Sequence, residues 1–224
     1  MNTTVYLIRH SVRFSMDDID TYNTTQSNII KNEKIILSVE GEKRSEILSN
    51  EKELQNIDVV YTSNCVRTLQ TAKYLLEKQK LKANIDERFD ERRVGKPNAD
   101  LYKDWFKLQF LDENFKTEGG ESQKEVRARF NEAFNEVLEK NEGKRIAIFS
   151  HGYAIVFFLM NWCKCEYIEG ANILKLTYKG KDILNEKINA PEVFKLKFEK
   201  NELKSIKNII FNDLPYKEGT GKRK

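Results

Sequence analysis

Near its start the sequence reads Val5-Tyr6-Leu7-Ile8-Arg9-His10, four β-forming apolar residues followed at once by two polar ones. A short, continuous apolar run is typical of a strand buried on both faces, as in a parallel sheet. Residues 58–61 and 145–149 have the same character, and residues 83–86 form a weaker candidate. These segments predict a mostly parallel central sheet.

Segments with the helical period separate these strands. Residues 38–48 read as a short helix, and Asn64 is expected to cap the next one. Ser122-x-x-Glu125 is a capping-box signature that opens a long amphipathic helix, and capping is the expected role of both Ser122 and its neighbour Glu121. The alternation of strands and helices predicts an α/β fold, a three-layer α/β/α sandwich with helices on both faces of the sheet.

The pattern changes from residue 173 onward. Residues 173–178, 193–198 and 203–210 alternate or are rich in β-formers, with turn signals between them. They predict an antiparallel C-terminal extension at one edge of the sheet.

The length of 224 residues fits one domain. We expect residues 1–216 to form it, with the segments at about 13–36 and 96–119 as a cap over the site. Residues 217–224, which carry four basic and one acidic side chain, are expected to be a disordered tail.

Composition and charge exclude several classes of protein. With 39% hydrophobic and 33% charged residues the chain is globular. Most of the net charge of +4 lies in the tail, so a nucleic-acid-binding face is not expected. The longest apolar run is too short for a membrane span, and no signal peptide is recognised. Three cysteines make reduced thiols in the cytoplasm the simplest expectation, and the close spacing of Cys163 and Cys165 argues against a zinc site. No metal or other cofactor is expected.

Four candidate site positions follow the predicted strands. Arg9-His10 follows the first strand, Arg67 the second, Glu91 the third and His151 the fourth. Ligands of open α/β sheets bind outside the carboxyl ends of the strands, so these residues are expected to meet in one crevice.

Arginines near the strand ends indicate the ligand. Arg9, Arg13 and Arg67 are among them, although lysine is the commoner base in this chain. The planar guanidinium matches phosphate oxygens in a bidentate way that lysine cannot, which predicts a phosphate-binding site. Ser11 and Arg13 are candidate substrate contacts. The alternatives are a merely tolerated small residue for Ser11 and a solvent-facing loop position for Arg13.

A histidine in such a pocket is a candidate nucleophile. Neighbouring guanidinium groups disfavour its protonated form, so His10 would keep a ring nitrogen free to attack phosphorus. Glu91 could then protonate the leaving oxygen and later deprotonate the water that cleaves the phosphohistidine. His151 would stabilise the equatorial phosphoryl oxygens.

Six motifs resemble those of the histidine phosphatase superfamily, which has the phosphoglycerate mutase-like fold. They are Leu7-Ile8-Arg9-His10, Leu37-Ser38-x-x-Gly41, Ser63-x-x-x-Arg67-x-x-Gln70-Thr71-Ala72, Phe89-x-Glu91-x-x-x-Gly95, Gly120-Glu121-Ser122 and Ser150-His151-Gly152. The resemblance implies His10 as the phosphorylated nucleophile, a phosphate pocket of Arg9, Arg67 and His151, and Glu91 as the proton donor. It also implies a small phosphorylated substrate.

The chain departs from the family at several positions. Ser11 stands where the family usually has glycine, and Asn64 where proline is common. The mutase branch typically continues after the acid with R-x-Y-G-x-L-x-G-x-N-K, whereas this chain reads Arg93-Val94-Gly95-Lys96-Pro97-Asn98. The sequence therefore favours a phosphomonoesterase. The alternatives are a phosphoglycerate mutase-type phosphoryl transferase and a non-catalytic protein that binds phosphorylated ligands.

Overall fold

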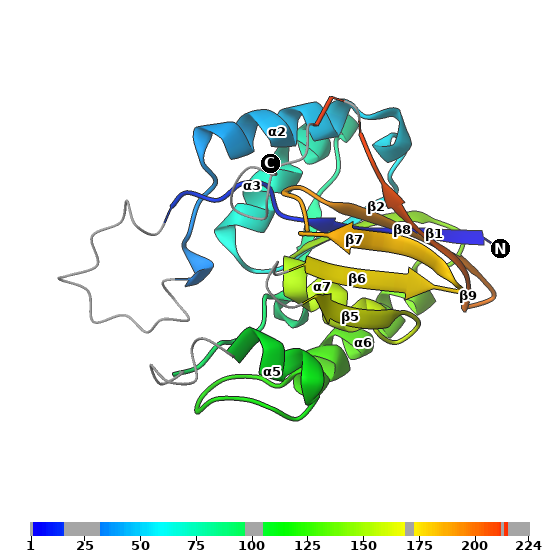
Figure 1. Cartoon of the computed structure of the whole chain (residues 1–224). Helices are drawn as coiled ribbons and strands as arrows, with labels where there is room; N and C mark the ends of the chain where they lie inside the picture. The colour runs from blue at the N-terminus through cyan, green and yellow to red at the C-terminus, as the bar shows by residue number, and fades with distance from the viewer. Residues whose placement is uncertain (1, 16–31, 97–104, 169–172, 212, 215–224) are drawn as a thin grey trace.

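The computed structural model describes residues 2–15, 32–96, 105–168, 173–211 and 213–214 (Figure 1). The elements in chain order are β1 (Asn2–Arg9), α2 (Val39–Asn50), η2 (Lys52–Leu54), β2 (Val59–Thr62), α3 (Val66–Gln79), β3 (Ala83–Ile85), η3 (Glu87–Phe89), α5 (Trp105–Leu111), α6 (Gln123–Lys140), β4 (Arg145–Ser150), α7 (Gly152–Leu159), β5 (Lys164–Ile168), β6 (Ile173–Tyr178), β7 (Lys181–Glu186), β8 (Val193–Glu199) and β9 (Glu202–Ile209).

The central sheet has six strands in the order β3-β2-β4-β1-β8-β9. The first four are mutually parallel, so their carboxyl ends lie at one edge. β8 and β9 extend the sheet beyond β1 in antiparallel pairing. The predicted parallel sheet with an antiparallel C-terminal extension is confirmed.

Helices cover both faces of this sheet, with α2 and α3 on one side and α6 and α7 on the other (Figure 1). The alternation of side chains along β1 explains this arrangement. Val5 and Leu7 are buried in the core that α6 and α7 complete, and Tyr6 and Ile8 are buried in the core beneath α2 and α3. The predicted three-layer α/β/α fold is confirmed.

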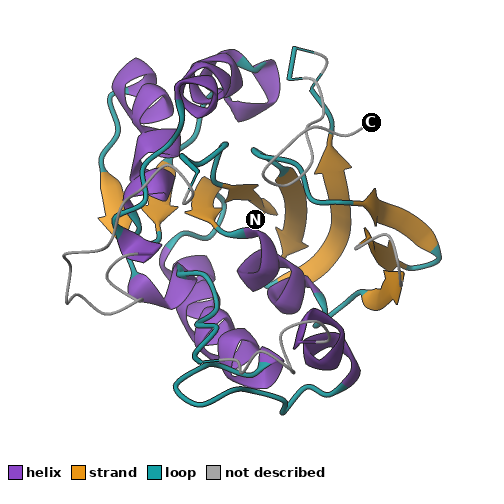
Figure 2. Cartoon of the chain, turned by 60° about the vertical axis from the view of Figure 1, so that its left-hand side comes forward, coloured by secondary structure: helices purple, strands orange, loops and turns teal. Residues whose placement is uncertain are grey.

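Part of the C-terminal region forms a second sheet. β5, β6 and β7 pair antiparallel in the order β5-β6-β7, beside the antiparallel end of the central sheet (Figure 2). The sequence pattern predicted β6 but assigned it to the same extension as β8 and β9. It did not predict β5 or β7, in which polar and charged residues leave no continuous β signal.

The helix starts test the capping predictions for Ser122 and Asn64. Ser38 accepts a hydrogen bond from Gly41 N and caps α2, and Ser122 forms the complete capping box with Glu125 at the start of α6. The prediction for Asn64 is wrong. Cys65 is the N-cap of α3 and makes no side-chain capping bond, and its own N–H donates to Ser63 Oγ.

Two predicted segments lie largely or wholly outside the described residues. They are the tail at 217–224 and most of the first cap segment, 16–31. Of the second cap segment, residues 97–104 are outside the described ranges and α5 is inside them. Within the described ranges, no helix combines the length and apolar character needed to span a bilayer.

Candidate active site

The pairing of β1 with β4 brings the two histidines together. Arg9 is the register partner of Ser150, so His10 and His151 both begin just beyond the paired ends. Backbone N–H of His10 donates to the Ser150 carbonyl at 2.9 Å, and the two imidazole centroids lie 5.1 Å apart. Both side chains are buried. The two histidines therefore meet at the carboxyl edge of the sheet, as predicted.

The His10 ring is held in one tautomer. Its Nδ1 lies 2.7 Å from the Ser11 carbonyl oxygen, which can only accept, so Nδ1 carries the hydrogen and Nε2 has the free lone pair. Burial, followed by the charges of Arg67 and Arg9, lowers the pKa of His10 well below its ordinary value. The ring is therefore neutral, with Nε2 available as a nucleophile.

His151 has the opposite tautomer. Arg67 Nη2 donates to its Nδ1 at 2.9 Å, and because guanidinium has no acceptor, Nε2 must carry the hydrogen. This N–H donates to Ser63 Oγ at 2.8 Å, and Ser63 Oγ lies 2.9 Å from Thr68 Oγ1. Burial, followed by the charge of Arg67, lowers the pKa of His151 well below its ordinary value. Arg67 and His151 thus form one buried, oriented unit.

Arg9 is the last residue of β1 and lies at the same edge of the sheet. Its Nη1 donates to the carbonyls of Ile188 and Asn189, at 2.6 and 3.1 Å. Burial lowers the pKa of Arg9, and the nearby charge of Glu91 opposes that effect. The segment just before β8 therefore orients this arginine, which the sequence did not indicate.

Glu91 lies at the start of α7. Its Oε1 accepts from the backbone N–H of Ala154 at 3.1 Å and of Arg92 at 3.0 Å, and its Oε2 accepts from Tyr153 N at 3.4 Å. Helix N-termini favour such oxygens. Two of these N–H groups, those of Tyr153 and Ala154, therefore hold the Glu91 carboxylate at the helix start, where its charge acts on Arg9.

The two candidate substrate contacts lie next to His10. Ser11 is fully buried, and its backbone N–H donates to Thr71 Oγ1 at 3.0 Å. Arg13 forms an isolated bridge with Leu37, and its charge contributes to the lowered pKa of His10. Ser11 Oγ and Arg67 Nε are buried polar atoms without a hydrogen-bond partner in the described part of the chain. Phosphate oxygens are acceptors that fit both.

Sequence reasoning missed three polar residues of the site. Ser63 and Thr68 orient His151, and Ser63 could have been found because it directly follows β2. Arg129 donates to the backbone that carries Glu91. The sequence feature that could have identified Arg129 is its position in the helical period. It lies three residues after the buried Val126 and therefore on the core-facing side of α6.

Glu121 has a different role from the one expected. The capping box of α6 uses Ser122 and Glu125, and Glu121 takes no part in it. Its carboxylate accepts instead from Arg129 and from the backbone N–H of Arg93. The prediction that capping explains Glu121 is wrong.

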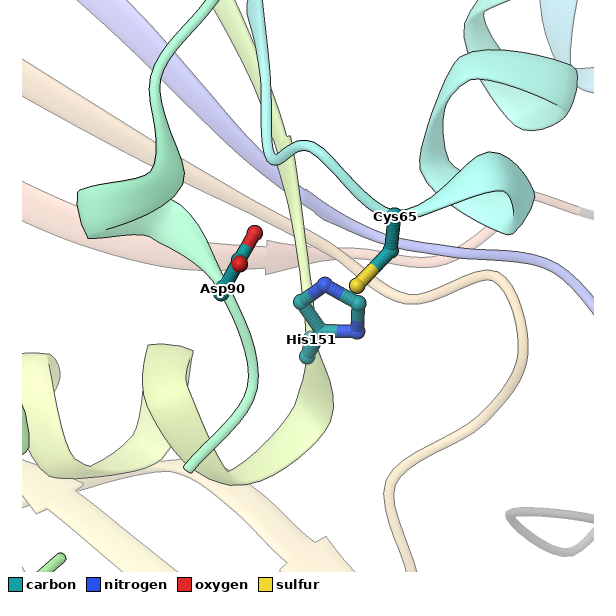
Figure 3. Close-up of side chains that lie close together, drawn as sticks. All are labelled: Cys65, Asp90 and His151. Carbon is teal, nitrogen blue, oxygen red and sulfur yellow. The ribbon is translucent and has the colours of Figure 1, made fainter. Parts of the chain in front are cut away.

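Cys65, Asp90 and His151 could be read as metal ligands (Figure 3). Their donor atoms lie within 4.8 Å of one another, the one such group among the described residues. The donor chemistry fits a cation poorly. Both nitrogens of His151 are engaged by Arg67 and Ser63, and burial raises the pKa of the Cys65 thiol to about 11, so it is protonated.

Two glycines join the Glu91 segment to the segment that precedes α6. Gly95 has φ of +72°, and a Cβ there would lie 2.5 Å from the Glu118 carbonyl oxygen and from Gly120 N. Glu121 N donates to the Arg93 carbonyl at 2.8 Å, and Lys96 N donates to the Glu118 carbonyl at 3.0 Å. Gly95 therefore permits a backbone contact between two of the motifs.

Comparison with known proteins gives one family. The model of the histidine phosphatase superfamily (branch 1) matches residues 5–179. No curated protein matches the sequence.

Three solved structures illustrate the similarity in fold. A mycobacterial glucosyl-3-phosphoglycerate phosphatase is 16% identical with a TM-score of 0.61, and the alignment covers 95% of this chain and 99% of that one. YhfR of Bacillus stearothermophilus is 17% identical with a TM-score of 0.63, covering 90% and 94%. A phosphoserine phosphatase of Entamoeba histolytica is 18% identical with a TM-score of 0.61, covering 91% and 96%. At identities this low, the similarity shows a shared fold alone.

Proposed function

The chain belongs to the histidine phosphatase superfamily, and we propose that it is a phosphomonoesterase that acts through a phosphohistidine on His10. The observation that carries the proposal is the hydrogen bond from His10 Nδ1 to the Ser11 carbonyl. It leaves Nε2 unprotonated and near the positive charges of Arg67 and Arg9. A neutral, oriented imidazole among cations is suited to attack a phosphate anion.

The first step transfers the phosphoryl group to the enzyme. His10 Nε2 forms the N–P bond while the bond from phosphorus to the ester oxygen breaks, and protonated Glu91 gives its proton to that oxygen. Arg9 and Arg67 hold the phosphoryl oxygens, and His151, whose ring nitrogens bond Arg67 and Ser63, keeps the Arg67 guanidinium in place. Fixed positive charge at these oxygens is the main source of rate enhancement in phosphoryl transfer.

The second step returns the enzyme to its starting state. Glu91, now a carboxylate, takes a proton from water as the water oxygen attacks phosphorus and the N–P bond breaks. Inorganic phosphate leaves, and Glu91 is protonated for the next cycle. The products are the alcohol and phosphate, with no other reactant than water.

The buried donors support an anionic ligand. Arg67 Nε and Ser11 Oγ lack partners among the described residues, and a phosphoryl group would supply the acceptors. Ser11 is then a substrate contact at the position where the family usually has glycine, and Arg13 is the candidate contact for the rest of the substrate.

The substrate class we propose is a small phosphorylated molecule. The names of two structural neighbours refer to such compounds, glucosyl-3-phosphoglycerate and phosphoserine. Hydrolysis is favoured over mutase-type transfer by the departure of residues 93–98 from the mutase segment.

We further propose that catalysis needs no metal. The one compact group of possible metal ligands in the described ranges has its histidine engaged by Arg67 and Ser63. All three cysteines are free thiols, which agrees with the reducing conditions of the cytoplasm, where we propose that the enzyme acts.

The test is a panel of phosphorylated compounds assayed for both products. Sugar phosphates, phosphoglycerates, nucleotides, phosphoserine and phosphopeptides are incubated with enzyme that has been dialysed against a chelator. We expect release of one phosphate per alcohol from at least one small substrate, at a rate that added divalent ions do not raise. Isomerised phosphoglycerate without free phosphate would replace hydrolysis by mutase chemistry, and dependence on a divalent ion would replace the metal-free mechanism.

A further inference from the structure

Helix α6 holds the backbone that carries Glu91. Arg129, in the second turn of α6, donates from Nη1 to the Arg88 carbonyl at 2.8 Å and from Nη2 to the Glu91 carbonyl at 3.3 Å. These two bonds connect α6 to both ends of the segment from Arg88 to Glu91. The segment is irregular beyond η3, so its own backbone bonds do not fix it.

Glu121 completes the connection from the other side. Its carboxylate accepts from Arg129 Nε at 2.8 Å and Nη2 at 3.1 Å, and from the backbone N–H of Arg93 at 2.8 Å. Its own N–H donates to the Arg93 carbonyl at 2.8 Å. Glu121 and Arg129 together therefore contact the chain on both sides of Glu91.

The chemistry of this pair requires its two residue types. Burial disfavours charge on Glu121, but the hydrogen bonds and charges of Arg129 and Arg93 together outweigh it and lower the pKa of the carboxyl. The side chain of Glu121 is only 6% exposed. Arg129 bonds a carboxylate and two carbonyls at once, which the planar fork of arginine allows and the single ammonium of lysine does not.

We propose that Glu121 and Arg129 form a positioning pair that keeps the Glu91 carboxylate in place for proton exchange with the substrate. The inference rests on the role of Glu91 in the proposed function. The carboxylate stays at the start of α7 only while the backbone of Glu91 stays within reach of the N–H groups of Tyr153 and Ala154. A misplacement of about 1 Å can cost roughly 100-fold in rate, so loss of the pair should weaken the acid without removing it.

The experiment compares leaving groups in Arg129→Met and Glu121→Gln. An alkyl phosphate needs a proton on its leaving oxygen, whereas p-nitrophenolate leaves readily without one. Pre-steady-state bursts give the phosphorylation rate for each substrate. For both variants we expect a loss of about 10- to 100-fold on the alkyl phosphate and less than about threefold on p-nitrophenyl phosphate. Inhibition by inorganic phosphate should change by less than about threefold in Glu121→Gln, because among the described residues the hydrogen bonds of Glu121 and Arg129 go to each other and to the backbone of residues 88–93 rather than to Arg9 or Arg67.

The decisive measurement combines Arg129→Met with Glu91→Gln in one double variant. If Arg129 acts through Glu91, then Arg129→Met should cost nothing further on the alkyl phosphate once Glu91 is glutamine. The matched control is Arg127→Met. Arg127 lies on α6, as Arg129 does, and the variant loses its ion pair with Glu113 at 2.5 Å. Both phosphorylation rates should stay at the wild-type level. Glu121→Gln keeps the side-chain shape and serves if Arg129→Met does not fold.

Two results would overturn the positioning role. One is an equal loss on both substrates, which means a general distortion of the site. The other is a full additional loss in the Glu91→Gln background. Failure of the proposed function is recognised separately, because wild-type enzyme would then show no burst on either substrate.

Discussion

Arg67 Nη2 donates to His151 Nδ1 across 2.9 Å, and this bond fixes which nitrogen of the buried imidazole carries its hydrogen. The bond joins Arg67 of α3, which follows β2, to His151, which follows β4. Arg67 therefore orients His151, and in the proposed mechanism it also supplies charge to the phosphoryl group.

Replacing Arg67 should therefore impair both binding and chemistry. We expect Arg67→Met to lower kcat/KM by roughly 10²- to 10³-fold, with a raised KM and a lowered kcat, since an electrostatic donor to the phosphoryl group is lost. Steady-state kinetics on the best substrate of the panel measure both constants. Arg145→Met is the control, because Arg145 lies at the opposite end of β4 and should leave kcat/KM unchanged. A variant of Arg67 that changes KM alone would restrict this residue to ground-state binding.

The backbone contact between two motifs predicts unequal effects of two glycine substitutions. Gly95 and Gly119 both have positive φ, +72° and +71°, so alanine is strained at either position. Only at Gly95 does the new Cβ meet backbone atoms, at 2.5 Å, whereas nothing lies within 4 Å of a Cβ at Gly119. Gly95→Ala should lower the free energy of unfolding by about 1–3 kcal/mol more than Gly119→Ala, as measured by urea denaturation. Equal losses would show that the contact with residues 118–120 contributes nothing.

The site residues that follow strands could be predicted because buried strands are recognisable in the sequence. Continuous apolar runs identified β1, β2 and β4, and parallel pairing forces the residues after them to one edge. His10, Arg67 and His151 were found by this rule and lie together in the structure. The register of Arg9 with Ser150 then explains why the two imidazoles are neighbours.

The supporting residues could not be predicted in the same way. Arg129 and Glu121 act through side-chain bonds to distant backbone atoms, and such bonds produce no periodicity. Asn64 was misassigned because its residue type suits an N-cap, whereas its backbone N–H donates to Asp90 and the helix begins two residues later. Local propensity is a weaker influence than these tertiary contacts.

The buried state of His10 has a consequence for stability. Its pKa is lowered well below the ordinary value of about 6.5 by burial, then by Arg67 and Arg9. Below pH 6.5 the unfolded chain therefore binds a proton that the folded protein does not, so stability present above that pH is lost as the pH falls. One such group accounts for up to about 1.4 kcal/mol per pH unit.

Replacing His10 should reduce this pH dependence. For His10→Asn we expect the free energy of unfolding to fall less steeply between pH 6 and pH 5 than in the wild type, by about 1 kcal/mol per pH unit. Urea denaturation at several pH values gives the two slopes, and His151 and Asp90 contribute to both. Parallel slopes would mean that His10 binds a proton as readily in the folded protein as in the unfolded chain.

The most direct test of the central claim is to trap the intermediate on His10. Enzyme and substrate labelled in the phosphoryl group are mixed and quenched within the first turnover, and the protein-bound label is then exposed to acid and to base. A phosphohistidine is a phosphoramidate, so the account predicts a label that is lost in acid and retained in base, that maps to His10, and that is absent in His10→Ala. A label that survives acid, or one that still forms in His10→Ala, would contradict it.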